Sequence, residues 1–143
     1  MRFNKLVLVI CLLLAPSFLN ADEYDGGVQA KVILKTATTG NGAPVAYLKT
    51  DQPEITALIV DIAPGAQTGW HKHSVPVYAY VVSGFLTVDI EGNISRQFNP
   101  GDVIVEVMNT RHNGVNKGSF PVKLIVFYTG AKDVPNVIKT DAP

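Results

Sequence analysis

The chain of 143 residues contains only three histidines, and their spacing suggests a metal site. Two of them, His71 and His73, lie one residue apart in the stretch GWHKHSV, and the third is His112. In a β-strand, residues i and i+2 project from the same face. Two imidazoles on one face can chelate a divalent metal when a third ligand reaches them from another strand. The pattern therefore predicts a metal site, and two solvent-facing histidines on an exposed strand are the alternative.

One carboxylate lies in the otherwise apolar segment DVIVEV, at Glu106. If its side chain faces the histidines, it could orient one of them, replace a missing ligand or act as a general base. A solvent-facing strand residue is the competing interpretation. The sequence carries no Gly-x-Ser-x-Gly elbow, P-loop or dinucleotide-binding glycine pattern that would suggest different chemistry.

Short β-strands have to position these side chains. Turns rich in Gly, Pro, Asn and Asp punctuate the chain, and no window shows a sustained apolar period of 3.6 residues. Many short strands with close turns predict an all-β sandwich or barrel. The C-terminal tail AKDVPNVIKTDAP could add an edge strand or lie across the surface. Apolar alternation and β-branched residues predict strands at 28–35, 55–63, 78–84, 85–90, 102–107 and 122–128.

The N-terminal segment differs in composition from the rest of the chain. Arg2 and Lys5 precede the apolar run LVLVICLLLAP, which gives way to the polar, acidic stretch after Ala21. This order predicts a secretory signal peptide over residues 1–21. The apolar run is too short for an ordinary membrane span, so we expect no stable membrane anchor after cleavage. The expected location is the periplasm or the outside of a bacterium.

The chain after this signal is expected to comprise a flexible leader, 22–30, and one domain, 31–143. The only cysteine, Cys11, lies in the segment expected to be removed, which excludes disulfides and a cysteine nucleophile in the mature chain. Removing two basic residues from 12 basic and 12 acidic ones leaves a net charge of −2. A slightly acidic domain without basic clusters is not expected to bind nucleic acid.

The spacing around the histidines resembles the two-motif signature of the cupin superfamily. The resemblance implies a single jelly-roll β-barrel with the three histidines as metal ligands, and a structural hydrogen-bonding role for the final asparagine. The 16 residues between the two motifs resemble the compact arrangement of small single-domain cupins. The first motif is matched by Gly65, His71, His73 and Gly84, and the second by Gly101, His112 and Asn116.

The chain departs from the cupin pattern at three positions. Val77 occupies the glutamate slot of the first motif, and valine cannot ligate a metal. Val107 and Asn109 replace the proline and glycine of the second motif, although asparagine tolerates a left-handed turn. The site thus resembles the three-histidine variant of the cupin centre. Such a centre keeps open coordination positions and could hold iron, zinc, nickel or copper.

Two classes of function follow from this resemblance. The first is a small metal-dependent enzyme, an oxygenase or isomerase acting on a small organic molecule in the barrel. The second is a non-catalytic periplasmic module that binds or senses a small molecule or a metal. Dimers are common in the superfamily that the chain resembles, so the resemblance also implies a homodimer. An edge strand near the N-terminus could pair between its subunits. Whether the chain is an enzyme stays open at this point, because a fold does not settle a function.

Overall fold

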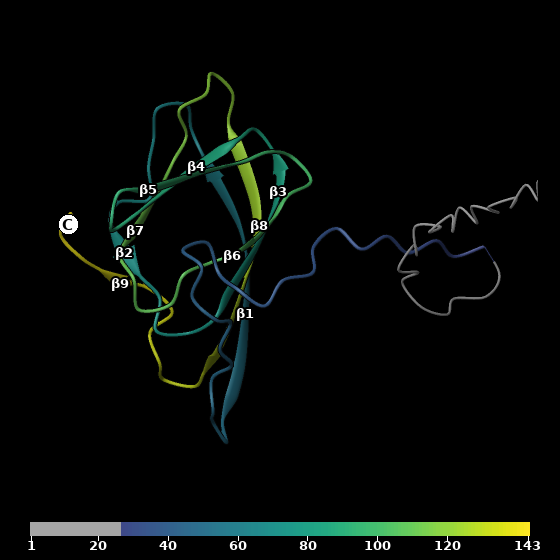
Figure 1. Cartoon of the computed structure of the whole chain (residues 1–143), viewed down its shortest axis with the longest axis vertical. Helices are drawn as coiled ribbons and strands as arrows, with labels where there is room; N and C mark the ends of the chain where they lie inside the picture. The colour runs from purple at the N-terminus through teal and green to yellow at the C-terminus, as the bar shows by residue number, and fades with distance from the viewer. Residues whose placement is uncertain (1–26) are drawn as a thin grey trace, which may run out of the picture. The chain divides into compact units, whose positions relative to one another are not determined.

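The computed structural model of the chain describes residues 27–143 (Figure 1). Every regular element in that part is a β-strand, and it contains no helix long and apolar enough to span a membrane. Residues 33–143 form one compact unit. The expected signal peptide and the first part of the expected leader lie outside the described residues. The strands are β1 Pro53–Ile62, β2 His71–Lys72, β3 Val77–Ser83, β4 Leu86–Ile90, β5 Ile94–Phe98, β6 Val103–Val105, β7 His112–Val115, β8 Val122–Ala131 and β9 Ile138–Lys139.

The strands form two sheets, whose orders are β1-β8-β3-β6 and β5-β4-β7-β2-β9. All pairings between these strands are antiparallel, and most neighbours within a sheet are not consecutive in the sequence. The longest pairing joins β1 to β8 over ten residues, from Pro53 opposite Ala131 to Ile62 opposite Val122. Two antiparallel sheets linked by such crossovers are typical of a jelly roll. The all-β jelly-roll prediction is confirmed.

The core consists of the inward side chains of both sheets. Along β3, buried Val77, Ala79 and Val81 alternate with more exposed residues such as Tyr80, as expected for a strand with one buried face. Burying each valine-sized side chain contributes roughly 1.5–3 kcal/mol. The core members are Ile62, Val75, Val77, Ala79, Val81, Leu86, Val88, Ile90, Ile104, Val107, Val122, Leu124, Val126 and Tyr128.

The glycine that closes the first motif is required by packing. Gly84 has φ +71°, and a Cβ on it would lie 2.7 Å from the Pro121 carbonyl oxygen and 2.9 Å from Val122 Cα. These neighbours are backbone atoms that cannot move aside cheaply. Only glycine combines a positive φ with this close approach. The turn after β3 therefore depends on the missing side chain.

Five of the six predicted strands have counterparts, namely β1, β3, β4, β6 and β8. The predicted strand at 28–35 is not formed, and its apolar side chains are exposed. A strand is stabilised by pairing with a neighbour, and no strand within residues 27–143 pairs with this segment. Sequence pattern missed β5, ISRQF, because it is short and mostly polar. The tail does add an edge strand, β9, which pairs with β2.

Candidate metal centre

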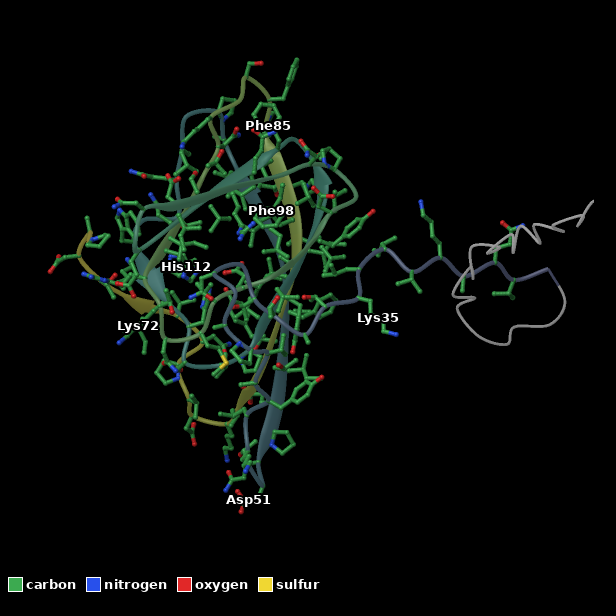
Figure 2. The ribbon with its side chains drawn as sticks, viewed as in Figure 1. Lys35, Asp51, Lys72, Phe85, Phe98 and His112 are labelled. Atoms are coloured by element: carbon green, nitrogen blue, oxygen red, sulfur yellow. The ribbon has the colours of Figure 1, made fainter. Side chains whose placement is uncertain are left out.

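The three histidines converge on one point between the sheets, from neighbouring strands. His71 of β2 and His112 of β7 are register partners, and His73 follows β2 directly. The ring centroids are 4.8 Å apart for His71 and His73, 4.3 Å for His71 and His112, and 4.9 Å for His73 and His112. Their exposed fractions are 9%, 2% and 2% in sequence order. The side chain of His112 points to the interior between the two sheets, whereas that of Lys72 points outward (Figure 2).

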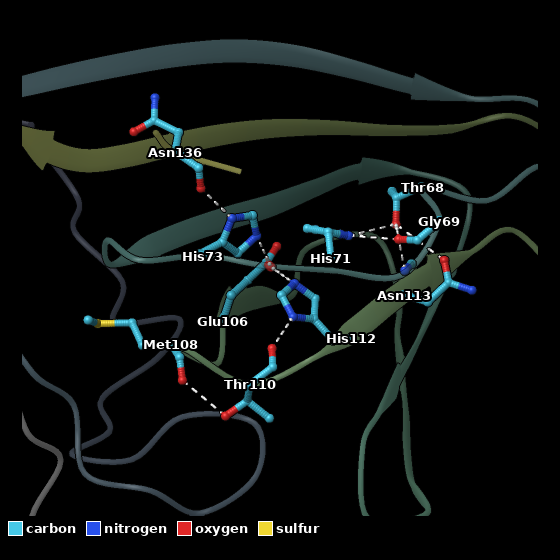
Figure 3. A network of polar contacts seen from close by, with 11 residues as sticks. Thr68, Gly69, His71, His73, Glu106, Met108, Thr110, His112, Asn113 and Asn136 are labelled. Atoms are coloured by element: carbon cyan, nitrogen blue, oxygen red, sulfur yellow. Dashed lines mark hydrogen bonds and ion pairs between the residues drawn. The ribbon is translucent and has the colours of Figure 1, made fainter. Parts of the chain in front are cut away.

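Glu106 joins this group from the opposite sheet. It follows β6, and its Oε2 lies 3.1 Å from His73 Nε2 and 2.9 Å from His112 Nε2 (Figure 3). Its side chain is 14% exposed, so it does not occupy the solvent-facing position considered as an alternative. The ligand atoms offered by Glu106 and the three histidines all lie within 4.8 Å of one another. The structure thus forms a possible metal site of three nitrogens and a carboxylate.

The position of Glu106 explains why the glutamate slot of the first motif can hold valine. The backbone N–H of Glu106 donates to the carbonyl oxygen of Val77 at 3.0 Å. The two residues are therefore neighbours across β3 and β6, and both side chains point inward. The carboxylate that the slot lacks comes from the next strand of the same sheet. Comparing motifs position by position along the sequence does not reveal this exchange, because it occurs between strands.

Backbone carbonyls define which ring nitrogen of each histidine carries the proton. A carbonyl oxygen only accepts hydrogen bonds, so each Nδ1 must donate its N–H to it. A neutral imidazole protonated at Nδ1 presents a lone pair at Nε2, the form that binds a metal. The pairs are His71 with Gly69 (2.8 Å), His73 with Asn136 (2.8 Å) and His112 with Thr110 (3.0 Å).

The donor set fits a divalent cation. Neutral Nε2 atoms and a carboxylate are all hydrogen-bond acceptors, so they repel one another unless a cation or protons lie between them. The buried Nε2 of His112 makes no hydrogen bond, although Oε2 of Glu106 is only 2.9 Å away. Three imidazole nitrogens with one carboxylate oxygen suit iron, zinc, nickel or copper, and do not distinguish among them. The residues present therefore fit the metal that the fold implies.

The charge of Glu106 favours a proton on His112 when no metal is bound. Burial alone would raise the pKa of Glu106, but the contacts with His112 and His73 outweigh it and lower the pKa to about 2. Burial alone would lower the pKa of His112, but its contact with Glu106 outweighs burial and raises that pKa. The pKa of His71 is lowered, chiefly by burial. A metal and a proton thus compete for the Nε2 atom of His112.

A cavity of about 60 Å³ adjoins the four residues inside the barrel. It has room for roughly four to six water molecules, or for a compact ligand that replaces them. Apart from the four candidate ligands, its polar side chains are Thr68 and Tyr128, and no lysine or arginine lines it. The Tyr128 ring packs edge-on against His73 at 5.5 Å, and its pKa is raised by burial and then by the charge of Glu106. The other walls are aliphatic: Val60, Ile62, Leu86, Val88, Leu124 and Val126.

The remaining residues of the second motif are structural. Asn109 has φ +52°, the left-handed turn conformation expected where the motif has glycine. Its N–H donates to the carbonyl oxygen of His73 at 2.8 Å, so this turn also fixes the backbone beside a candidate ligand. Asn116 is fully buried, and its amide donates to the carbonyls of Ile62 and Phe120, both at 2.9 Å. These bonds hold the residue after β7 against the last residue of β1 and against the turn before β8.

Comparison with known proteins yields one family and many solved structures. A family model described as "Cupin domain" matches residues 58–128, which include all four candidate ligands. No curated protein matches the sequence significantly. An oxalate decarboxylase from Lactobacillus farciminis, solved as a formate complex, is 27% identical with a TM-score of 0.51, over 59% of this chain and 26% of its own.

Two further structures support the fold. The lyase DddQ from Ruegeria pomeroyi, described as a DMSP lyase, is 22% identical with a TM-score of 0.54, over 71% of this chain and 48% of its own. A Cupin 2 conserved barrel domain protein from Salinispora arenicola is 23% identical with a TM-score of 0.50, over 54% of this chain and 64% of its own. The chain thus spans less than two thirds of each of these structures. From the family match, the two sheets and the shared barrel, we conclude that this chain belongs to the cupin superfamily.

Proposed function

We propose that the chain binds one divalent transition metal through His71, His73, His112 and Glu106, and that it is a metal-dependent enzyme acting on a small organic molecule. The observation that carries this proposal is the set of three Nδ1–carbonyl hydrogen bonds, which leaves three Nε2 lone pairs beside one carboxylate. When bound, the metal supplies a Lewis acid or a redox centre for isomerase or oxygenase chemistry.

The residues of this chain define what the cavity would accept. Glu106 contributes one negative charge, so with a divalent cation the site carries a net charge of about +1 and attracts a negatively polarised oxygen. The aliphatic walls exclude water and strengthen that attraction. The cavity volume of about 60 Å³ limits the substrate to a compact molecule. We therefore propose a small carbonyl or carboxylate compound as the substrate class.

Tyr128 is our candidate for a proton donor or hydrogen-bond donor to the substrate. It lines the cavity together with the four candidate ligands. Its raised pKa keeps the phenol protonated at neutral pH. Glu106 is less suited to act as a base, because its carboxylate lies against two histidines and its pKa is low. We therefore assign the carboxylate to metal binding and the phenol to contact with the substrate.

Elemental analysis of the untagged mature protein, purified without chelators, tests the metal. We expect close to one iron, nickel, copper or zinc per chain, and loss of the metal in His112→Ala. Arg111→Ala is the matched control, because Arg111 is next in sequence but bonds Glu91 on the other side of the strand. No metal after reconstitution with each of the four ions would contradict the proposal. The histidines would then serve an organic ligand.

A non-catalytic binding or sensing module is the second candidate function. The small number of polar groups in the cavity favours it, because Thr68 and Tyr128 are the only polar side chains there besides the candidate ligands. The two functions differ in turnover. Metal-loaded protein that consumes none of a panel of small carbonyl and carboxylate compounds, while one of them raises its melting temperature, would favour the binding module.

The proposed location is the periplasm or the extracellular space, after removal of residues 1–21. The support for it is the order of the N-terminal sequence, with two basic residues before a short apolar run and a polar stretch. Expression of the full chain in a Gram-negative host tests this. We expect a periplasmic product that begins at Asp22. Full-length chain in the membrane fraction would contradict both the cleavage and the location.

We also propose a homodimer that buries the outer face of the sheet β1-β8-β3-β6. Ile59, Ile125 and Tyr80 are register partners on three adjacent strands and are 69%, 37% and 37% exposed. Ile55 and Phe127 extend the same face at 71% and 43% exposure. A contiguous apolar face of this kind is a common site of association. Sedimentation should give a dimer that Ile59→Lys converts to a monomer, and a monomeric wild type would contradict this proposal.

A further inference from the structure

The three histidines differ in the origin of the carbonyl that orients them. His71 and His112 each donate from Nδ1 to the carbonyl of the residue two positions earlier. His73 instead donates to the carbonyl of Asn136, 63 residues further along the chain, at 2.8 Å (Figure 3). Two of the orienting bonds are therefore built into the local turn. The third exists only when a distant segment is in place.

Several contacts hold Asn136 in position. Its side-chain amide donates to Thr56 Oγ1 on β1 at 3.2 Å. A Cβ on Gly130 would lie 3.0 Å from Asn136 Oδ1, so a larger residue there would crowd the amide. The hydroxyl of Ser74, next to His73, donates to the carbonyl of the preceding Pro135 at 2.8 Å. The segment is thus fixed from β1, from β8 and from the loop that carries the histidine.

The same segment also pairs with the strand that carries His71. Lys139 of β9 is the register partner of His71, and β9 lies at the free edge of β2. One residue on, the N–H of Thr140 donates to the carbonyl of Trp70 at 3.0 Å. We call residues 135–140 the C-terminal strap. The match to the cupin family model ends at residue 128, so the strap lies outside the part of the chain that the family model describes.

We infer that the C-terminal strap is a positioning element of the metal centre. The carbonyl of Asn136 holds the Nδ1–H tautomer of His73 and the direction of its ring, so that Nε2 faces the other ligands. Without the strap the ring is free to turn, and metal binding has to supply the cost of ordering it. Linkage requires the reverse as well, so a bound metal holds the strap in place. This inference rests on the proposed metal binding.

Truncation provides the direct test. One variant of the mature chain ends at Val134 and lacks the strap, and its matched control ends at Thr140 and lacks only the last three residues. Titration with Co²⁺, followed by the visible absorption of the bound ion, gives the affinity of each. We expect binding roughly 10–100-fold weaker without the strap, the usual cost of losing a bond that orients a ligand. The control should stay within about twofold of the full mature chain.

Point variants keep the test decisive if the shorter truncation does not fold. Thr56→Val removes the acceptor of the Asn136 amide and leaves every candidate ligand in place. We expect weaker Co²⁺ binding and an altered absorption spectrum of the bound Co²⁺, because the ring of His73 is less well aligned. Thr50→Val is the matched control. It also replaces a threonine hydroxyl, but that hydroxyl accepts a hydrogen bond only from the nearby N–H of Gln52. It should change neither property. The inference would be overturned if Thr56→Val had the same Co²⁺ affinity and the same absorption spectrum of bound Co²⁺ as Thr50→Val.

Hydrogen exchange tests the reverse direction of the coupling, without any assay of activity. Adding Co²⁺ should slow the exchange of the Thr140 amide, whereas amides of β5, remote from the strap in sheet order, should not change. Unchanged exchange at Thr140 would overturn the inference. A full mature chain that takes up no Co²⁺ would instead count against the proposed metal site. A chain that binds Co²⁺ equally well with and without the strap would count against the strap alone.

Discussion

The two sheets make different contributions to the candidate metal centre. The sheet β5-β4-β7-β2-β9 carries His71 and His112 on adjacent strands, with His73 directly after β2. The sheet β1-β8-β3-β6 supplies one carboxylate, from Glu106 after β6. The first sheet thus provides neutral nitrogens whose protons are fixed by backbone carbonyls, and the second provides the negative charge.

This division shows which part of the centre can change without loss of the site. The histidines depend on the pairing of β2 with β7 and on turns that supply their carbonyl partners. The carboxylate requires only an inward position at the right height in the opposite sheet. Val77 and Glu106 are neighbours across two strands and both meet that requirement. We therefore expect that a carboxylate on either strand can complete the site, whereas the histidines cannot be moved in this way.

Removing a histidine should have the largest effect on this centre. His112→Ala eliminates one of four ligands, and sharing a binding free energy of about 10–16 kcal/mol among four ligands gives on the order of 3 kcal/mol for each. We expect metal affinity to fall by more than about 100-fold, as measured by competition with a chelator. The β fold should remain, which far-ultraviolet circular dichroism checks. Undiminished affinity would mean that the nitrogens of the first sheet do not bind the metal.

The sequence predicts the histidine side of this comparison well, for a physical reason. Spacing of two residues along a strand places two side chains on one face whatever the rest of the chain does. The strands that line the core also show clear alternation, as in the YAYVVS stretch of β3. Local patterns of this kind follow from the geometry of a single strand. They predict an all-β sandwich or barrel and a common face for His71 and His73, whereas the jelly roll is implied by the resemblance to cupins.

The carboxylate and the strap depend on contacts between strands, which no local pattern records. Glu106 follows an apolar strand, and only the register of β6 against β3 shows that it reaches the histidines. Asn136 lies in an otherwise exposed stretch of the tail, without any apolar alternation that would mark it. The predicted strand at 28–35 illustrates the opposite error. Its pattern is strand-like, but a pattern does not supply a partner strand.

A metal that joins the two sheets should stabilise the whole barrel, and this is the second largest effect we expect. At a free metal concentration 100 times the dissociation constant, binding to the folded state alone contributes about 2.7 kcal/mol. Adding a chelator to the loaded protein should therefore lower the free energy of unfolding by about that amount, as measured with urea. The same treatment of His112→Ala should lower it by no more than about 0.4 kcal/mol. Equal loss in both proteins would show that the chelator acts elsewhere.

Moving the carboxylate tests directly whether the second sheet can supply it from either strand. Glu106→Gln should weaken metal binding by roughly 10–100-fold, because the amide keeps the size but loses the charge. Combining Glu106→Val with Val77→Glu should bind the metal more tightly than Glu106→Val alone, because both positions face inward side by side. Chelator competition on these variants gives the ranking. A double variant no better than Glu106→Val would show that only β6 can present the ligand.

The smallest effect we predict is the pH dependence of stability in the metal-free protein. The pKa of Glu106 is lowered to about 2 by His112 and His73, from about 4.5 in the unfolded chain. A carboxylate with a lowered pKa stabilises the fold above the unfolded pKa, and this contribution disappears as the pH falls from 4.5 towards 2. We expect a loss on the order of 2 kcal/mol over that range, measured by urea unfolding. Glu106→Gln has no carboxylate at this position, so its free energy of unfolding should fall less steeply over the same pH range. An equal slope in the two proteins would show that the charge of Glu106 does not stabilise the contact between the sheets.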